Sequence, residues 1–209
     1  EIPLERYNES TSPSVIYQDG EAAYFSRDYD EAADVFTLYT ERMSENAWGH
    51  YMLGLSLWKT GELEAAAEAL DHALEIKPDH IKSLVNLARV NLQLDRPEAA
   101  LVSIEQALAL DSSYPDGYRV LGRVYHELDR REEAVSAYHQ AVSLHSNDTW
   151  SLNNLGLVYL EMDDADSALA PLARAVAIDA DQAVFYNNLG TALERTGHAA
   201  QAVEAFAKA

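Results

Sequence analysis

The sequence contains no cysteine, which excludes disulfide bonds, thiolate chemistry and cysteine metal sites. Basic residues are scarce, since 15 Lys and Arg stand against 35 Asp and Glu and leave a formal net charge of -20. That charge repels phosphate backbones and anionic lipid, so we expect neither nucleic acid nor a membrane surface as a partner. No apolar run approaches the roughly 20 residues of a transmembrane helix. We therefore expect a soluble protein without membrane insertion, while the sequence leaves its compartment, cytoplasm or periplasm, undecided.

Motifs of catalysis and of metal binding are missing as well. The sequence has no phosphate-binding loop, no Gly-x-Ser-x-Gly, no His-Glu-x-x-His and no dinucleotide-binding Gly-x-Gly-x-x-Gly. Its seven histidines occupy scattered positions that do not make a metal-ligand spacing. We expect no enzyme activity, no catalytic residues, no bound metal and no cofactor.

What the sequence does contain is a repeat of 34 residues. The run Asn-Asn-Leu-Gly at 153–156 returns at 187–190, and steps of 34 from its glycine meet a small residue throughout the chain. The chain divides into units 13–46, 47–80, 81–114, 115–148, 149–182 and a shorter sixth, 183–209. Residues 1–12 lack a sustained apolar period and are predicted to form a flexible leader. The rest is predicted to be one elongated domain over 13–209.

Small and large residues recur at fixed positions when each unit is numbered from 1. Position 8 is Gly or Ala, position 20 is Ala in every unit, and position 24 is large. Small residues let two helices approach closely, and the large ones fill the space between units. Position 15 is Gly or Asp in five of the six units, and these residues end helices readily. Each unit is therefore predicted to be a pair of antiparallel helices.

These columns resemble the tetratricopeptide repeat family, whose repeat is 34 residues long. Unit 47–80 fits best, because it carries the family's Leu-Gly, its two Ala and its Pro at Leu53, Gly54, Ala66, Ala73 and Pro78. The family's Trp at position 4 is absent, and its Pro survives only once. The first unit is degenerate, which suits a capping repeat. The resemblance covers 13–209 and implies an all-α fold, a right-handed superhelical solenoid of antiparallel helix pairs with five full repeats and a partial sixth.

The two ends of the chain indicate a piece of a longer protein. The sequence begins with Glu1 rather than Met, and the sixth unit stops at Ala209 before its second helix is complete. We expect the apolar residues of that unit to have little cover within this chain. Further repeats, another domain or a second copy of the chain would then cover them.

In proteins of this family the first helices line a concave groove, with positions 2, 5, 6, 9, 12 and 13 facing in. These positions recur at steps of three and four and so form one stripe of a helix, called the groove stripe below. The stripe carries all three tryptophans, and its six cations against five acids give a net charge of +1. The candidate peptide-binding residues are Tyr17, Tyr24, Trp48, Tyr51, Trp58, Lys82, Asn86, Arg89, Arg119, Arg123, Trp150, Asn153, Asn154, Asn187 and Asn188.

Each group of candidates has two interpretations. The aromatic residues either anchor a partner or pack one unit against the next. The arginines and lysines either pair with a partner's carboxylates or neutralise acids of neighbouring helices. The asparagines can hold a peptide backbone, in a pattern similar to the repeats of O-linked N-acetylglucosamine transferase. The carboxylate clamp of chaperone-binding relatives does not fit the residues around Asn86, so binding of a chaperone's acidic tail is not expected.

The leading hypothesis is a non-catalytic scaffold that binds a peptide or protein segment in the concave groove. A second hypothesis is a self-assembling protein that forms homo-oligomers through the uncovered sixth repeat. A third is the targeting domain of a larger enzyme. The identity of the partner does not follow from the sequence, because this architecture serves many functions.

Overall fold

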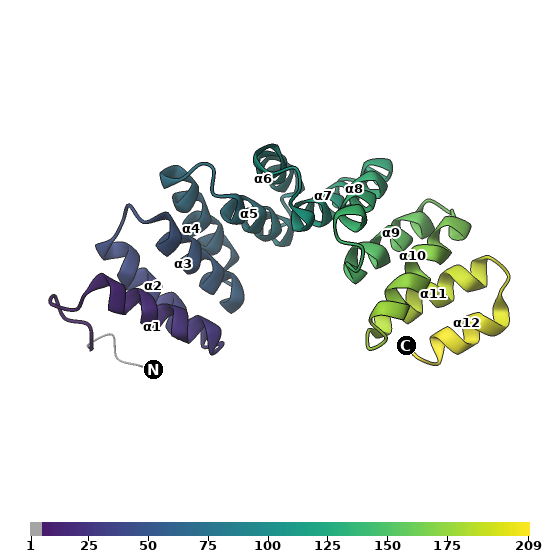
Figure 1. Ribbon diagram of the computed structural model, residues 1–209, viewed down its shortest axis with the longest axis horizontal. Helices are drawn as coiled ribbons and strands as arrows, with labels where there is room; N and C mark the ends of the chain where they lie inside the picture. The colour runs from purple at the N-terminus through teal and green to yellow at the C-terminus, as the bar shows by residue number, and fades with distance from the viewer. Residues whose placement is uncertain (1–5) are drawn as a thin grey trace. The chain divides into compact units, whose positions relative to one another are not determined.

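The computed structural model describes residues 6–209, with the side chain of Pro115 excepted. This part of the chain holds twelve α-helices and no β-strand (Figure 1). The predicted all-α solenoid of helix pairs is confirmed. Contacts between Cα atoms group the chain into two compact units, residues 1–110 and 111–209. The prediction of a single domain over 13–209 stays a prediction.

The first compact unit contains three helix pairs. They are α1 (Pro13–Phe25) with α2 (Tyr29–Arg42), α3 (Ala47–Thr60) with α4 (Leu63–Ile76), and α5 (Ile81–Gln93) with α6 (Pro97–Leu110). The second compact unit repeats the arrangement. Its pairs are α7 (Pro115–Glu127) with α8 (Arg131–Leu144), α9 (Thr149–Glu161) with α10 (Ala165–Ile178), and α11 (Ala183–Arg195) with α12 (Ala199–Phe206). Every first helix begins at the first residue of a 34-residue repeat.

The turn inside each helix pair uses one backbone conformation six times. The residue at position 15 has a positive φ in every repeat, between 57° at two aspartates and 94° at Gly61. Such left-handed residues close the C-terminus of a helix, and Gly and Asp adopt the conformation at little cost. Arg27 does so too, with φ 67°, although its side chain disfavours the conformation. The prediction of a turn at position 15 therefore holds even where the residue type is unusual.

Small residues bring the two helices of a pair close together. The alanines at position 20 are fully buried in the first five repeats, as are the large side chains at position 24. A Cβ added to Gly122 of α7 would lie 2.7 Å from the ring of Tyr138 on α8. The position-24 side chain thus occupies the space that the missing Cβ leaves. This contact holds the pairs together and fixes which face each first helix presents outward.

The described part of the predicted leader packs against the first helix pair. Tyr7 is buried, and its hydroxyl donates a hydrogen bond of 2.9 Å to Asp19. The Arg42 guanidinium donates to the carbonyl oxygens of Tyr7, Asn8 and Thr11 at 3.3 to 3.4 Å. The remainder of the leader, residues 1–5, lies outside the described residues.

The sixth repeat leaves apolar side chains exposed, as expected from the sequence. Val203 is 68% exposed and Phe206 40% exposed, both on α12, whereas Leu189 and Leu193 of α11 are partly buried. Over residues 6–209, no helix combines the length and the apolar character that crossing a bilayer requires.

Candidate functional site

The first helices of neighbouring repeats lie side by side within each compact unit. Helices α1 and α5 both contact α3, and α7 and α11 both contact α9. Side chains 35 residues apart meet across these contacts. Trp58 Nε1 donates to Gln93 Oε1 at 2.7 Å, and Asn188 Nδ2 donates to Asn153 Oδ1 at 2.9 Å. Position 5 of one repeat therefore lies beside position 6 of the next, and position 12 lies beside position 13.

Exposure varies along the groove stripe in a regular way. Position 13 is exposed in all six repeats, and position 2 is exposed in five of them. Positions 5 and 6 are mostly buried or partly buried, because they meet the neighbouring repeat. Within each compact unit, the accessible parts of the stripe are thus its two edges.

At one edge of the first unit, Trp48 stands in a cluster of rings. It is 44% exposed and packs edge-to-face on Tyr51 and His80, with ring centroids 5.5 and 4.7 Å apart. Lys82 Nζ lies 5.3 Å from the centroid of the Trp48 ring, within the range of a cation–π interaction. Tyr51 is buried, and its hydroxyl accepts a hydrogen bond of 3.3 Å from Asn86. The indole of Trp48 is therefore held in place while nearly half of it faces solvent.

His80 is a component of this cluster that the sequence did not single out. It stands at position 34, outside the groove stripe, and only 5% of it is exposed. Its Nδ1 lies 2.6 Å from Ser83 Oγ, whereas Nε2 has no hydrogen-bond partner among residues 6–209. Burial lowers the pKa of His80, and the nearby charges of Lys77 and Lys82 lower it further. The imidazole is thus held neutral beneath the Trp48 ring.

Asn86 and Arg89 follow on the same helix, α5. Asn86 is 8% exposed and donates to the carbonyl oxygen of Lys82 at 3.0 Å as well as to Tyr51. Arg89 donates to Asn86 Oδ1 at 3.1 Å. The side-chain amide of Asn86 therefore already forms hydrogen bonds with other residues of the groove stripe.

Tyr17 and Tyr24 of α1 pack against other rings. The Tyr17 ring makes edge-to-face contacts with Phe36 and Tyr39 at centroid distances of 5.5 and 5.2 Å. Burial raises the pKa of Tyr17 to about 12. Tyr24 is half-buried beside Tyr29, at 5.4 Å between centroids. At these two positions the structure favours packing within the first helix pair over an exposed anchor.

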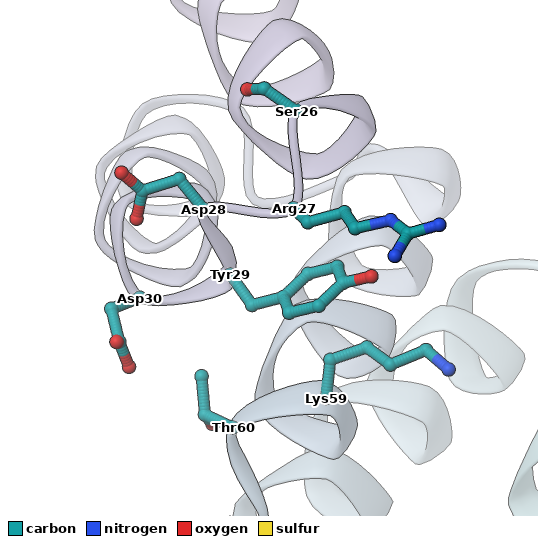
Figure 2. A pocket seen from close by; sticks show the side chains of 7 residues that line it. All are labelled: Ser26, Arg27, Asp28, Tyr29, Asp30, Lys59 and Thr60. Atoms are coloured by element: carbon teal, nitrogen blue, oxygen red, sulfur yellow. The ribbon is translucent and has the colours of Figure 1, made fainter.

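A pocket of about 460 Å³ opens at the other edge of the first unit, where the turn of the first repeat meets the end of α3. Figure 2 shows Arg27 and Lys59 extending to the same side of this pocket, with the Tyr29 hydroxyl between them. Asp28 and Asp30 lie on the other side. Lys59 Nζ also lies 5.2 Å from the ring centroid of Trp58.

In the second unit, the arginines of the stripe form ion pairs with nearby acidic residues. Arg119 contacts Asp116 at 2.6 Å and Asp148 at 3.3 Å. Arg123 Nε lies 3.9 Å from Glu127. Asp148 is buried and also accepts the backbone N–H of Ser151, so it caps α9 while it pairs with Arg119. The neutralising interpretation of these cations applies to this unit.

The remaining candidates of the second unit divide into exposed and buried residues. Trp150 is 46% exposed and packs edge-to-face on the buried Phe185, with ring centroids 5.1 Å apart. Asn187 is exposed, Asn154 and Asn188 are partly buried, and Asn153 is 3% exposed. Across residues 6–209, no three side chains of His, Asp or Glu are grouped as a metal site.

Comparison with known proteins settles the family. Three models described as tetratricopeptide repeat match residues 117–181, residues 17–81, and residues 81–114 together with 183–209. The chain belongs to the tetratricopeptide repeat family. No curated protein matches the sequence at a significant level. Proteins of this family bind protein or peptide partners, and this tetratricopeptide repeat chain is a protein-interaction scaffold.

Several solved tetratricopeptide repeat structures are similar to the chain. A structure of pilF from Pseudomonas aeruginosa is 26% identical with a TM-score of 0.70, and the match covers 78% of this chain and 75% of that one. YrrB, described as a TPR protein with an unusual peptide-binding site, is 25% identical with a TM-score of 0.67, covering 85% and 91%. A MamA fragment from Desulfovibrio magneticus RS-1 has a TM-score of 0.75 at 19% identity, covering 81% and 96%, and supports the fold alone.

Proposed function

We propose that the chain is a non-catalytic scaffold that binds a segment of a partner protein along the groove stripe. The observation that carries this proposal is the solvent exposure of two tryptophans. Trp48 and Trp150 both stand at position 2 of their repeats, and each exposes nearly half of its surface at the edge of the stripe. The similar protein YrrB, which has an unusual peptide-binding site, supports the same general role.

Both tryptophans are suited to anchor a partner. A buried ring supports each indole edge-on, His80 beneath Trp48 and Phe185 beneath Trp150. An indole fixed in this way loses little conformational entropy on binding and offers a large contact area. Tryptophan is also among the residues that most often dominate the binding energy of an interface. The edges of the stripe therefore supply preformed contact points in both compact units.

Site-specific crosslinking tests the proposal. A photoreactive benzoylphenylalanine replaces Trp48 or Trp150 in the protein expressed in its native cell, and adducts are identified by mass spectrometry. The matched control carries the same group at Val102, which is 57% exposed on the second helix α6. We expect adducts to a partner from the two tryptophan positions and none from Val102. Equal labelling from all three positions, or labelling from Val102 alone, would contradict the proposal.

Self-association is a second candidate function, and the exposed side chains of α12 favour it. Val203 and Phe206 are both apolar and are 68% and 40% exposed. Exposed apolar patches of this kind mark contact surfaces. Sedimentation equilibrium of the wild type and of Val203→Lys tests this role, with Val102→Lys as the control. A wild type that stays monomeric at high concentration would exclude it.

A further inference from the structure

We infer that the groove stripe of the first compact unit binds an acidic segment, with carboxylates seated at its two edges beside Lys82 and beside Lys59 with Arg27. This inference rests on the proposed function and names the chemistry of the partner. It assigns recognition of negative charge to one unit of the chain, although the chain as a whole carries a net charge of -20.

The charge of the groove stripe differs between the two units. In the first unit the stripe carries Lys59, Lys82 and Arg89 against the single acid Glu21, a net charge of +2. In the second unit three arginines face four acids, a net charge of -1. A positive patch on an acidic protein attracts acidic partners and orients them during encounter. The first unit therefore offers the charge complementarity that an acidic segment needs.

Lys59 and Lys82 are also chemically available. Among residues 6–209, neither of these lysines forms an ion pair, in contrast to Arg119 of the second unit. Each ammonium group instead lies over an indole, at 5.2 Å from the Trp58 ring and 5.3 Å from the Trp48 ring. A cation–π contact of this kind restrains the lysine while its N–H donors stay free for a carboxylate.

The pocket at the turn of the first repeat strengthens the Lys59 edge. Arg27 forms no ion pair among the described residues, and its guanidinium extends to the same side as the Lys59 ammonium and the Tyr29 hydroxyl (Figure 2). Asp28 lies on the other side, where its carboxylate accepts the backbone N–H of Glu31 at 3.2 Å. These three donors, directed to one side, suit a carboxylate rather than a cation.

The distance between the two edges sets the length of the segment. Lys82 stands at position 2 of its repeat and Lys59 at position 13 of the preceding one. Because position 2 of one repeat lies beside position 1 of the preceding one, the two lysines are offset by twelve positions, about 18 Å along the helices. An extended chain covers that distance in about five residues. The partner segment is therefore at least about six residues long, carries acids near both of its ends, and places apolar side chains over the exposed Trp48.

Fluorescence polarisation with defined peptides tests the inference. Three labelled peptides of about ten residues share one sequence of Leu and Ser in which the remaining positions are all Glu, all Gln or all Lys. We expect the Glu peptide to bind the full chain, and its affinity to fall by at least about tenfold between about 50 and 300 mM salt. We expect the Gln peptide to bind weakly. Any binding of the Lys peptide should be unchanged in a Trp48→Ala variant.

Two charge reversals locate the site on the chain. Lys59→Glu with Lys82→Glu should weaken binding of the Glu peptide by about tenfold or more, since each lost pair is replaced by repulsion. Arg174→Glu with Lys208→Glu makes the same change of four charges at two exposed residues outside the stripe and should leave the affinity within about twofold. Equal thermal stability of all variants shows that each is folded.

The outcomes separate this inference from the proposed function. Equal affinity for the Glu and Gln peptides, or a double reversal without effect, overturns the acidic segment. If Trp48 still forms crosslinks to a partner in that case, the groove stripe remains the docking site. If no peptide binds and no crosslink forms, both proposals fail. Self-association that the double reversal abolishes would make a second copy of the chain the occupant and would also overturn the inference.

Discussion

Replacing Gly122 by alanine should destabilise the fold by about 1 to 2 kcal/mol. The added Cβ would lie 2.7 Å from two carbons of the Tyr138 ring and 2.9 Å from a third. Tyr138 is fully buried, so its ring has no free space to enter. Overpacking of this kind costs about 1 to 3 kcal/mol. Contacts this short place the cost in the upper part of that range, at about 2 to 3 kcal/mol, and alanine in place of glycine within a helix returns about 1 kcal/mol of helix propensity, which leaves a net loss of about 1 to 2 kcal/mol.

The third repeat shows how the same contact tolerates a Cβ. It has Ala88 at position 8 and Ile104 at position 24, and both side chains are fully buried. We therefore expect Tyr138→Ile to accommodate the alanine at 122. Tyr138→Ile alone should be destabilising by about 2 to 4 kcal/mol, because a smaller side chain leaves a cavity. The double variant should be at least about 1 kcal/mol more stable than the sum of the two single changes predicts.

Urea unfolding of the wild type, both single variants and the double variant, followed by circular dichroism, measures this coupling. The slope of the unfolding free energy against urea should be the same for all four proteins, which shows that the same surface unfolds. Effects that add to within about 0.5 kcal/mol would refute the pairing of positions 8 and 24. They would also refute the view that this contact sets the approach of the two helices.

Two further predictions concern His80 and Asn188. Because the pKa of His80 is lowered in the folded state, protonation of His80 favours unfolding, and the unfolding free energy should fall as pH decreases below about 6.5. His80→Asn should weaken this pH dependence, as measured by urea titrations at several pH values. An unchanged pH dependence would contradict a lowered pKa of His80 in the folded state. Asn188→Ala leaves the buried Asn153 Oδ1 without its donor, so it should lower the unfolding free energy by about 1 to 2 kcal/mol. Asn187→Ala changes an exposed position and is the control, which should have little effect in the same assay.

The fold could be predicted from the sequence because its determinants recur in one register. The small and large positions, the turn at position 15 and the start of every first helix follow from a spacing of 34, which a sequence displays directly. Arg27 shows why the register matters more than the residue type. Its own propensity argues against a left-handed turn, yet the helices on both sides impose one.

The site was predictable only in part, since its chemistry depends on side chains that only folding brings into contact. The stripe predicts Trp48 and Tyr51 on one side of α3, but only the packing shows that the first is half-exposed and the second buried. The sequence left two interpretations of Arg119 open, and the folded chain brings Asp148, the last residue of the same repeat, to its guanidinium. His80 carried no signal at all, because it stands outside the stripe and gains its role from contact with the Trp48 ring.

Two of the asparagines at position 6 form hydrogen bonds to the preceding repeat. At position 6, Asn86 bonds to Tyr51 and Asn188 bonds to Asn153, in each case across to position 5 of the preceding repeat. An amide in that place contributes to the stacking of neighbouring repeats within each compact unit. In the proposed mode of binding, partner recognition falls to positions 2 and 13, which are exposed in most repeats. Those are the positions at which Lys82 and Lys59 stand, and they carry the chemistry that distinguishes the first unit from the second.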